Sequence, residues 1–288
     1  MTASSFSMSS ASRRRSITNA VMLGVAALCA ALCIAILFSI VAYVFIHALP
    51  YLKFGFFLHS PAPVGETSGG VAPAIVGTGI MVAIASVIGI PLGMGMGIFL
   101  SEYASPRWAD VVRFTADVMT GIPSVVVGLF IYLVVVLRTG SFSAVAGALA
   151  LAFIMLPIVA RSSEEMLKLV PTSQREAAFA LGIPRWRAIV SVVLPGAARG
   201  LITGSLLAIA RAAGETAPLL FTSLANRFVS TDVSQPMDSL PVRIYQYAIS
   251  PYNDQHAQAW TAALILILLV LLFSIVARFV VGRQGGAR

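Results

Sequence analysis

Long apolar runs constrain the fold of this chain more than any other feature of its sequence. A helix needs about 20 mostly apolar residues to cross a bilayer, because the hydrocarbon is about 30 Å thick and a helix rises about 1.5 Å per residue. Six segments reach this length, at residues 20–48, 73–101, 112–137, 142–161, 200–222 and 259–281. The sequence therefore predicts an all-α integral membrane protein with six transmembrane helices.

Composition and glycine spacing agree with a bundle of helices in lipid. Only 10% of the 288 residues are charged and 58% are hydrophobic, whereas a soluble domain carries about 25% charged residues. Gly89, Gly93 and Gly97 are four residues apart in the second segment and lie on one helix face. Glycines with this spacing let a second helix approach closely, so we expect this segment to pack against a neighbour.

The net charge of +8 is better explained by membrane topology than by a nucleic-acid partner. With the N-terminus inside, fourteen Lys and Arg lie in inner loops and tails, four lie in outer loops, and Arg211 lies within a span. An excess of Lys and Arg in cytoplasmic loops is the usual pattern of multi-pass proteins. We therefore expect both termini to be cytoplasmic, with membrane lipid around the chain and no bound nucleic acid.

The segments outside the spans divide the chain into regions. Residues 1–16 are Ser-rich and basic, which predicts a disordered cytoplasmic tail. Residues 17–72 contain the first span and an outer segment, residues 73–281 contain the remaining spans, and residues 282–288 form a second cytoplasmic tail. The first apolar run approaches 30 residues, whereas the apolar region of a cleaved signal peptide has about 7–15, so we expect this run to stay in the membrane.

The most polar inner loop, residues 162–198, lies between the fourth and fifth spans. It is too rich in helix formers to be a flexible linker. Thr172 or Ser173 is expected to cap a short helix, Gly182 to end it, and Pro184 to start the next element. The loop therefore predicts a helix–turn–helix piece on the cytoplasmic side, where it would form a docking surface for a partner.

The stretch ARAAGETAPLL places Arg211 and Glu215 four residues apart in an otherwise apolar span. An uncompensated Arg at the bilayer centre costs at least about 2.5–3.5 kcal/mol on insertion scales, and Glu215 can neutralise it. The pair shares a helix face with Gly204 and Ala208, so we expect this face to line the bundle interior. Two interpretations stay open: a salt bridge that fixes helix packing, or part of an anion path, because guanidinium presents a planar fork of N–H groups to oxyanions.

The loop sequence EAAFALGIPRWRAIVSVVLP resembles the EAA motif of the inner-membrane permeases of ABC importers. The matching positions are Glu176, Ala177, Ala178, Gly182, Val192, Leu194 and Pro195. In such permeases this short helix lodges in a cleft of the ATP-binding subunit and transmits its motion. The resemblance implies the type I ABC importer permease fold, with coupling to an ATPase through Glu176, Ala177, Ala178, Gly182 and Pro184.

Five further stretches resemble the phosphate-specific permeases, in particular their PstA-type subunit. They are GGVAPAIVGTG (69–79), GIPSVVVGLF (121–130), LPIVAR (156–161), ARAAGETAPLLFT (210–222) and DSLPVRIYQYA (238–248), in the order of the family. In those permeases the residues that match Arg211 and Arg161 are associated with phosphate movement. The resemblance implies a substrate pathway that includes Arg211, Glu215 and Arg161, in a permease of the bacterial plasma membrane.

Glu215 should repel an anion, and two hypotheses account for it. In the first, Glu215 holds Arg211 in a resting pair that phosphate displaces, so that binding stays weak enough for release. In the second, its carboxylate accepts the O–H of hydrogen phosphate, which sulfate lacks, and so reinforces discrimination between the two anions.

The resemblance also implies partners. They are a second, homologous permease subunit (PstC-type), a dimeric cytoplasmic ATPase (PstB-type) and an extracytoplasmic phosphate-binding protein (PstS-type). The chain contains no GxxxxGK[ST] sequence, so it is expected to be a transport permease and not an enzyme, with ATP and Mg bound by the ATPase. No cofactor or metal is expected in this chain, because its two cysteines, Cys29 and Cys33, are too few for a metal site.

Three alternatives stay open. The nearest is a permease for another oxyanion, such as sulfate or molybdate. A proton-coupled secondary transporter would use Glu215 or Asp117 as the proton carrier, but would leave the loop at residues 172–195 without a purpose. A membrane receptor that signals phosphate status would alter regulation and leave uptake intact.

Overall fold

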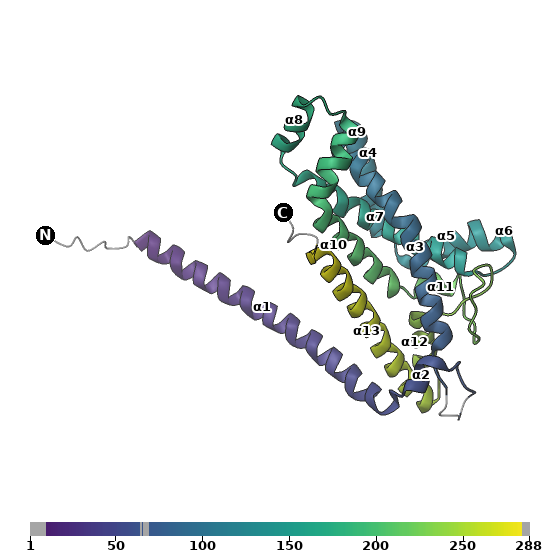
Figure 1. The fold of residues 1–288 in the computed structure, drawn as a ribbon. Coiled ribbons are helices and arrows are strands. Elements are labelled where there is room, and N and C mark those ends of the chain that lie inside the picture. Colours follow the sequence, from purple (N-terminus) through teal and green to yellow (C-terminus); the bar gives the residue numbers. More distant parts are fainter. Residues whose placement is uncertain (1–9, 64, 66–68, 284–288) are drawn as a thin grey trace.

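The computed structural model of the chain is helical and describes residues 10–63, 65 and 69–283, with side chains for 14–63, 65 and 69–275. Five of these helices are long and apolar enough to cross a membrane. Four of the five gather into one bundle, and the first helix runs away from it (Figure 1). They are built around α1 (Ser10–Ala48), α3 (Ala72–Ile98), α7 (Ala144–Lys168), α10 (Leu194–Ala213) and α13 (Asn253–Arg283). The span of α3 runs on to Tyr103, and that of α10 already begins at Arg185.

The expected third span, residues 112–137, is not one continuous helix. It is replaced by α4 (Pro106–Gly121) and a second helical stretch, Ser124–Thr139, which meet at an angle of 99°. Ile122 is extended, with φ −69° and ψ 128°, because a residue that precedes proline is disfavoured in the helical region, and Pro123 has no N–H to continue the helical hydrogen bonds. The chain therefore has five continuous candidate spans, or six if the bent pair is counted as one.

Shorter elements connect these helices. On the N-terminal side are the 3₁₀ turn η1 (Leu49–Tyr51), α2 (Phe54–Leu58), the π-helical turn η2 (Phe99–Tyr103), and the three pieces of the second arm of the bent pair, α5 (Ser124–Ile131), the π-helical η3 (Tyr132–Val136) and α6 (Leu137–Thr139). Further along are α8 (Thr172–Ala180), α9 (Arg185–Ala188), the π-helical η4 (Ile189–Val193), α11 (Ala217–Leu220) and α12 (Leu240–Ala248). In Figure 1 α8 and α9 lie at one end of the bundle, and α2 and α12 lie at the other.

The boundaries of the predicted tails differ from the structure. We expected residues 1–16 to be a disordered tail, but α1 begins at Ser10, because Arg is a good helix former and extends the helix of the span. Residues 1–9 lie outside the described part of the chain. At the other end α13 reaches Arg283, so the predicted tail at 282–288 falls almost entirely outside it as well.

The first helix meets the bundle only near its C-terminal end. There Val44 and Ala48 pack against Leu264 of α13, and the ring of Tyr43 lies edge-on to that of Trp260 at a centroid distance of 5.3 Å. The most apolar part of α1 buries nothing within this chain. Its apolar surface is therefore left to lipid or to another protein.

Close contact between α3 and α7 forms the centre of the bundle. A Cβ on Gly93 would lie 2.7 Å from the Cβ of Val159, and one on Gly97 would lie 2.5 Å from the Cβ of Ser163. The expectation that the glycine face packs against a neighbouring helix is thus confirmed, and the neighbour is α7. The buried core continues from this contact through residues of α3, α7 and α10, among them Met81, Leu151, Met155, Val159, Ala208 and Ala212.

Candidate translocation and coupling sites

Arg211 and Glu215 lie together at the end of α10, as their spacing predicts. The Nε of Arg211 is 3.7 Å from Oε1 of Glu215, whereas a charge-assisted hydrogen bond between such groups is about 2.7–2.9 Å long. Within this chain the side chain of Arg211 is 56% exposed and that of Glu215 is 14% exposed. The two charges are thus loosely paired, and the guanidinium can reach other partners.

The predicted common face of α10 divides in the structure. Gly204 and Ala208 are buried, and any side chain at Gly204 would collide with Ser162 of α7. Arg211 instead follows the exposed stripe of Thr203 and Leu207, because a small-residue face that lets α7 approach leaves no room for a guanidinium. The expectation that Arg211 points into the interior of this chain is therefore wrong, and it lies at the edge of the α7–α10 contact.

Arg161 lies on α7 beside Ser162, which contacts Gly204 of α10. Its Nε is 3.5 Å from Oε1 of Glu165 and its Nη1 is 3.8 Å from Oε2 of Glu164. The side chain borders a groove of about 400 Å³ between α4 and α7, lined by Asp117, Thr120, Pro157, Ile158, Arg161, Ser162 and Glu165. On α10, Arg211 lies seven residues after Gly204, or about 10 Å further along the helix axis.

Glu164 is a buried carboxylate that the sequence analysis did not single out. Its side chain is 1% exposed, and Oε1 accepts hydrogen bonds from Nε of Arg113, at 2.7 Å, and from Nζ of Lys168. Arg113 comes from α4, so the carboxylate ties α4 to the end of α7. The spacing of Glu164 and Lys168 was visible in the sequence, but Arg113 and Glu164 are 51 positions apart, so no local signal pointed to that contact.

The predicted helix–turn–helix piece follows α7, and its second helix, α9, continues through η4 into α10 as one span, Arg185–Ala213. The first is α8, Gly182 follows it with φ +76°, and Pro184 directly precedes α9. A left-handed φ is strained for any residue with a side chain, which explains the glycine at this corner. The expected Thr172 or Ser173 cap is wrong, because Pro171 is the N-cap residue and makes no side-chain cap hydrogen bond.

α8, α9 and the turn between them display apolar side chains at one end of the bundle. Ala178 of the EAA sequence is buried against the rest of the chain, whereas Glu176 and Ala177 are exposed. Three large apolar side chains are also exposed nearby, namely Phe179 (46%), Leu181 (81%) and Trp186 (63%). We call Phe179, Leu181 and Trp186 the docking surface, after the partner contact that the sequence predicts for this loop.

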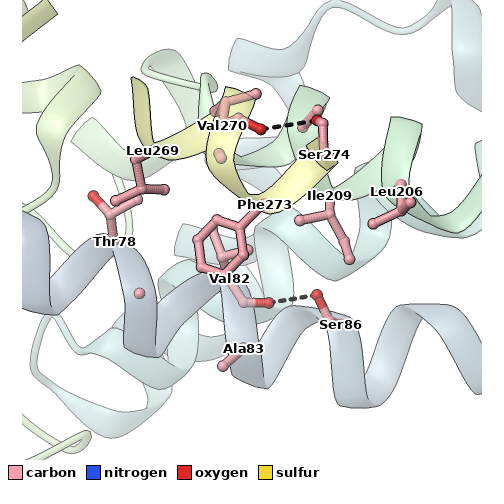
Figure 2. Close-up of a pocket in the computed structure, with 13 residues that line it drawn as sticks. Thr78, Val82, Ala83, Ser86, Leu206, Ile209, Leu269, Val270, Phe273 and Ser274 are labelled. Atoms are coloured by element: carbon pink, nitrogen blue, oxygen red, sulfur yellow. Dashed lines mark hydrogen bonds between the residues drawn. The ribbon is translucent and has the colours of Figure 1, made fainter. Parts of the chain in front are cut away.

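An apolar pocket between α3, α10 and α13 is unsuited to an anion. Its volume is about 170 Å³, and no charged residue lines it. Figure 2 shows two of its hydroxyls already in use, because Ser86 donates to the carbonyl of Val82 and Ser274 to that of Val270. The third hydroxyl, of Thr78, donates to the carbonyl of Ala74. Among the described residues, no group of three or more His, Cys, Asp or Glu is arranged to hold a metal ion.

The family model for binding-protein-dependent transport system inner membrane components matches residues 89–285. The chain belongs to this family. Its helical architecture is that of the type I importer permeases: a chain of the inward-facing MetNI methionine ABC transporter matches with a TM-score of 0.64 at 20% identity, over 74% of this chain and 95% of that one. An amino acid ABC transporter matches with a TM-score of 0.52, over 74% and 92% of the two chains.

Similar permeases carry the name "phosphate transport system permease protein PstA". The protein of that name from Yersinia pestis is 48% identical over 81% of this chain and 79% of its own length. That of Xylella fastidiosa strain 9a5c is 49% identical over 76% of each chain. PstA 1 of Mycobacterium tuberculosis strain H37Rv is 42% identical over 76% of this chain and 73% of its own. The permease described here thus belongs with the PstA proteins, and several of its helices are long and apolar enough to cross a membrane.

Proposed function

We propose that this chain is the PstA-type permease subunit of an ATP-driven importer of inorganic phosphate. The observation that carries the proposal is its identity of 48% to a phosphate permease over four-fifths of the chain. The exposed docking surface on α8 and α9 supports it, because a permease without a nucleotide site of its own needs a place where an ATPase can push. Neither an oxyanion other than phosphate nor a proton-coupled mechanism is favoured by these relatives.

The proposal includes the surroundings of the chain. Its partners are a PstC-type permease, a dimeric PstB-type ATPase that binds ATP and Mg, and an extracytoplasmic PstS-type protein. The chain itself needs no cofactor. With the bent pair counted as one span, both termini fall on the cytoplasmic side of the plasma membrane, together with α8 and α9, which agrees with the excess of Lys and Arg in those segments.

Arg211, Glu215 and Arg161 form the proposed substrate pathway. Arg211 is exposed in the single chain and only loosely paired, which supports this proposal. A second permease subunit packed against this face would bury Arg211 between the two subunits. There the planar guanidinium groups can donate to phosphate oxygens in pairs. The carboxylate of Glu215 then competes with phosphate for Arg211, which favours release.

The test is ATP-dependent uptake of labelled phosphate into vesicles that carry the whole complex, with ATP hydrolysis and subunit assembly measured on the same samples. Arg211→Ala is expected to lower uptake about tenfold or more, as for the loss of a hydrogen bond to a charged group, with assembly intact. Arg227→Ala, which removes an exposed arginine of the outer loop, is the matched control. Normal uptake by Arg211→Ala would place the pathway elsewhere, and uptake by the parent that follows a proton gradient instead of ATP would refute the proposed function.

A further inference from the structure

We call residues 162–198 the coupling loop. A buried carboxylate, Glu102, attaches this loop to the second span, which contains α3. Glu102 lies in the π-helical turn η2 that ends α3, and only 8% of its surface is exposed. Its Oε1 accepts hydrogen bonds from Nη2 of Arg175, at 3.0 Å, and from Oγ of Ser101, at 3.1 Å. Arg175 is the residue immediately before the EAA sequence, on α8.

The same guanidinium also binds the C-terminal end of α7. Nη2 of Arg175 also donates to the carbonyl of Leu167, at 2.8 Å, and Nη1 donates to the carbonyl of Val170. Leu167 lies in the last turn of α7 and Val170 follows it. Arg175 therefore joins three elements at one point: the coupling helix α8, the end of α3 and the end of α7.

A second arginine secures the other side of the loop to the same turn. Nη2 of Arg185, at the start of α9, donates to the backbone carbonyl of Glu102. Its guanidinium carbon lies over the ring of Tyr103, 4.9 Å from the centroid, in the range of a cation–π contact. Both short helices are thus tied to η2, one on each side of the corner at Gly182.

These contacts determine whether a displacement of α8 also moves the membrane-spanning helices. A helix joined to the spans only by its loops would move with little effect on the bundle. Here a buried ion pair must move with its partners, because separating the charges would leave Glu102 buried and unpaired. The contact of Gly93 and Gly97 with α7 then makes α3 and α7 move as one body.

We propose that the Glu102–Arg175 ion pair is the positioning link that carries displacement of the coupling helix into α3 and α7. Neither residue touches phosphate in this role. Glu102 and Arg175 act through the spans that they move, so their loss separates ATP hydrolysis by the partner from uptake. The inference rests on the proposed function and assigns it a mechanical residue pair outside the EAA positions.

The test measures the number of ATP molecules hydrolysed per phosphate taken up, in vesicles that carry the whole complex. Glu102→Gln and Arg175→Lys each remove part of the link while keeping side-chain size, and each is expected to raise this ratio about fivefold or more, the lower range of coupling between linked sites. Glu102→Asp keeps the carboxylate, so its ratio is expected to stay closer to that of the parent than the ratio of Glu102→Gln. Arg107→Lys, at an exposed arginine in the first turn of α4, five residues after Glu102, is the matched control and should leave the ratio unchanged.

Each outcome bears on the link separately from the proposed function. If the parent complex takes up phosphate with ATP and both single variants assemble and keep its ratio, the link is refuted while the function stands. If the single variants lose assembly, the residues are structural and the link is also refuted. A raised ratio with assembly intact, with Glu102→Asp closer to the parent than Glu102→Gln, supports the link.

Discussion

Asp238 and Arg243 form an ion pair that is almost completely removed from solvent. Oδ2 of Asp238 is 2.6 Å from Nη2 and 2.8 Å from Nε of Arg243, and its Oδ1 accepts a hydrogen bond from the backbone N–H of Ser239 at 2.9 Å. The carbonyl of Asp238 lies where a side chain at Gly77 would be, so this segment is pressed directly onto α3. The pair fixes the start of α12 against the bundle.

Removing the acid of this pair should destabilise the fold. Asp238→Asn leaves Arg243 buried without its charge partner, which costs about 3–5 kcal/mol when a buried ion pair is broken. We expect a clear loss of thermal stability of the purified permease in detergent. Asp232→Asn, in the same loop but exposed, is the control and should change stability by less than about 0.5 kcal/mol. Equal melting of the two variants would contradict the burial of the pair.

The contact of α3 with α7 predicts opposite results for two neighbouring glycines. Gly93→Ala forces a methyl group to 2.7 Å from Val159, and overpacking of this kind costs about 1–3 kcal/mol. Gly95→Ala has nothing within 4 Å of the added Cβ and should be neutral or stabilise by up to about 1 kcal/mol, because alanine favours helix. Thermal unfolding of both variants checks this, and a stable Gly93→Ala variant would mean that the helices are further apart.

If the docking surface binds the ATPase, a substitution there should weaken ATPase binding and leave the fold intact. Trp186→Ala removes an exposed aromatic side chain of α9, and truncation of an interface Trp commonly costs more than about 2 kcal/mol of binding energy. We expect binding of the purified ATPase to weaken by about thirtyfold, as that energy implies, with thermal stability unchanged. Phe228→Ala, at an exposed phenylalanine of the outer loop, is the control. Undiminished ATPase binding by Trp186→Ala would remove this residue from the interface.

The loose pair of Arg211 and Glu215 predicts a kinetic signature. If Glu215 competes with phosphate for Arg211, Glu215→Gln should bind phosphate more tightly and release it more slowly, so that KM and kcat for uptake both fall. The measurement is the dependence of uptake on phosphate concentration, with sulfate as a competitor. A KM that stays unchanged or rises would reject competition, and new inhibition by sulfate would favour the hypothesis that Glu215 accepts the phosphate O–H.

Local patterns in the sequence predicted the parts of this fold that depend on neighbouring residues. The coupling loop was found because Gly182 and Pro184 act within a few positions of the helices that they bound. The glycine face of α3 was found for the same reason. The break at Pro123 was missed, because the apolar run on both sides is long enough for a span and hides a turn of 99°.

Contacts between distant segments could not be predicted in the same way. Glu102 and Arg175 are 73 residues apart, and nothing local to either residue names its partner. Arg243 is one of the four Lys and Arg that the sequence assigns to the outer loops. Only the folded chain brings it to Asp238 and removes both side chains from water. The orientation of Arg211 depends on how closely α7 approaches Gly204, and sequence spacing alone does not give that distance.

The π-helical turn at Phe99–Tyr103 has an evolutionary consequence. Such a turn holds one residue more than an α-helical turn, so it is what a single inserted codon would leave in an otherwise regular helix. Each residue of an α-helix turns the chain by about 100°, and removing one from this turn would swing Glu102 away from Arg175 while α3 kept its glycine face on α7. Attachment of the coupling loop thus depends on the length of this helix as much as on the identity of its residues. A change of one residue in that length is a route by which related permeases could gain or lose the attachment.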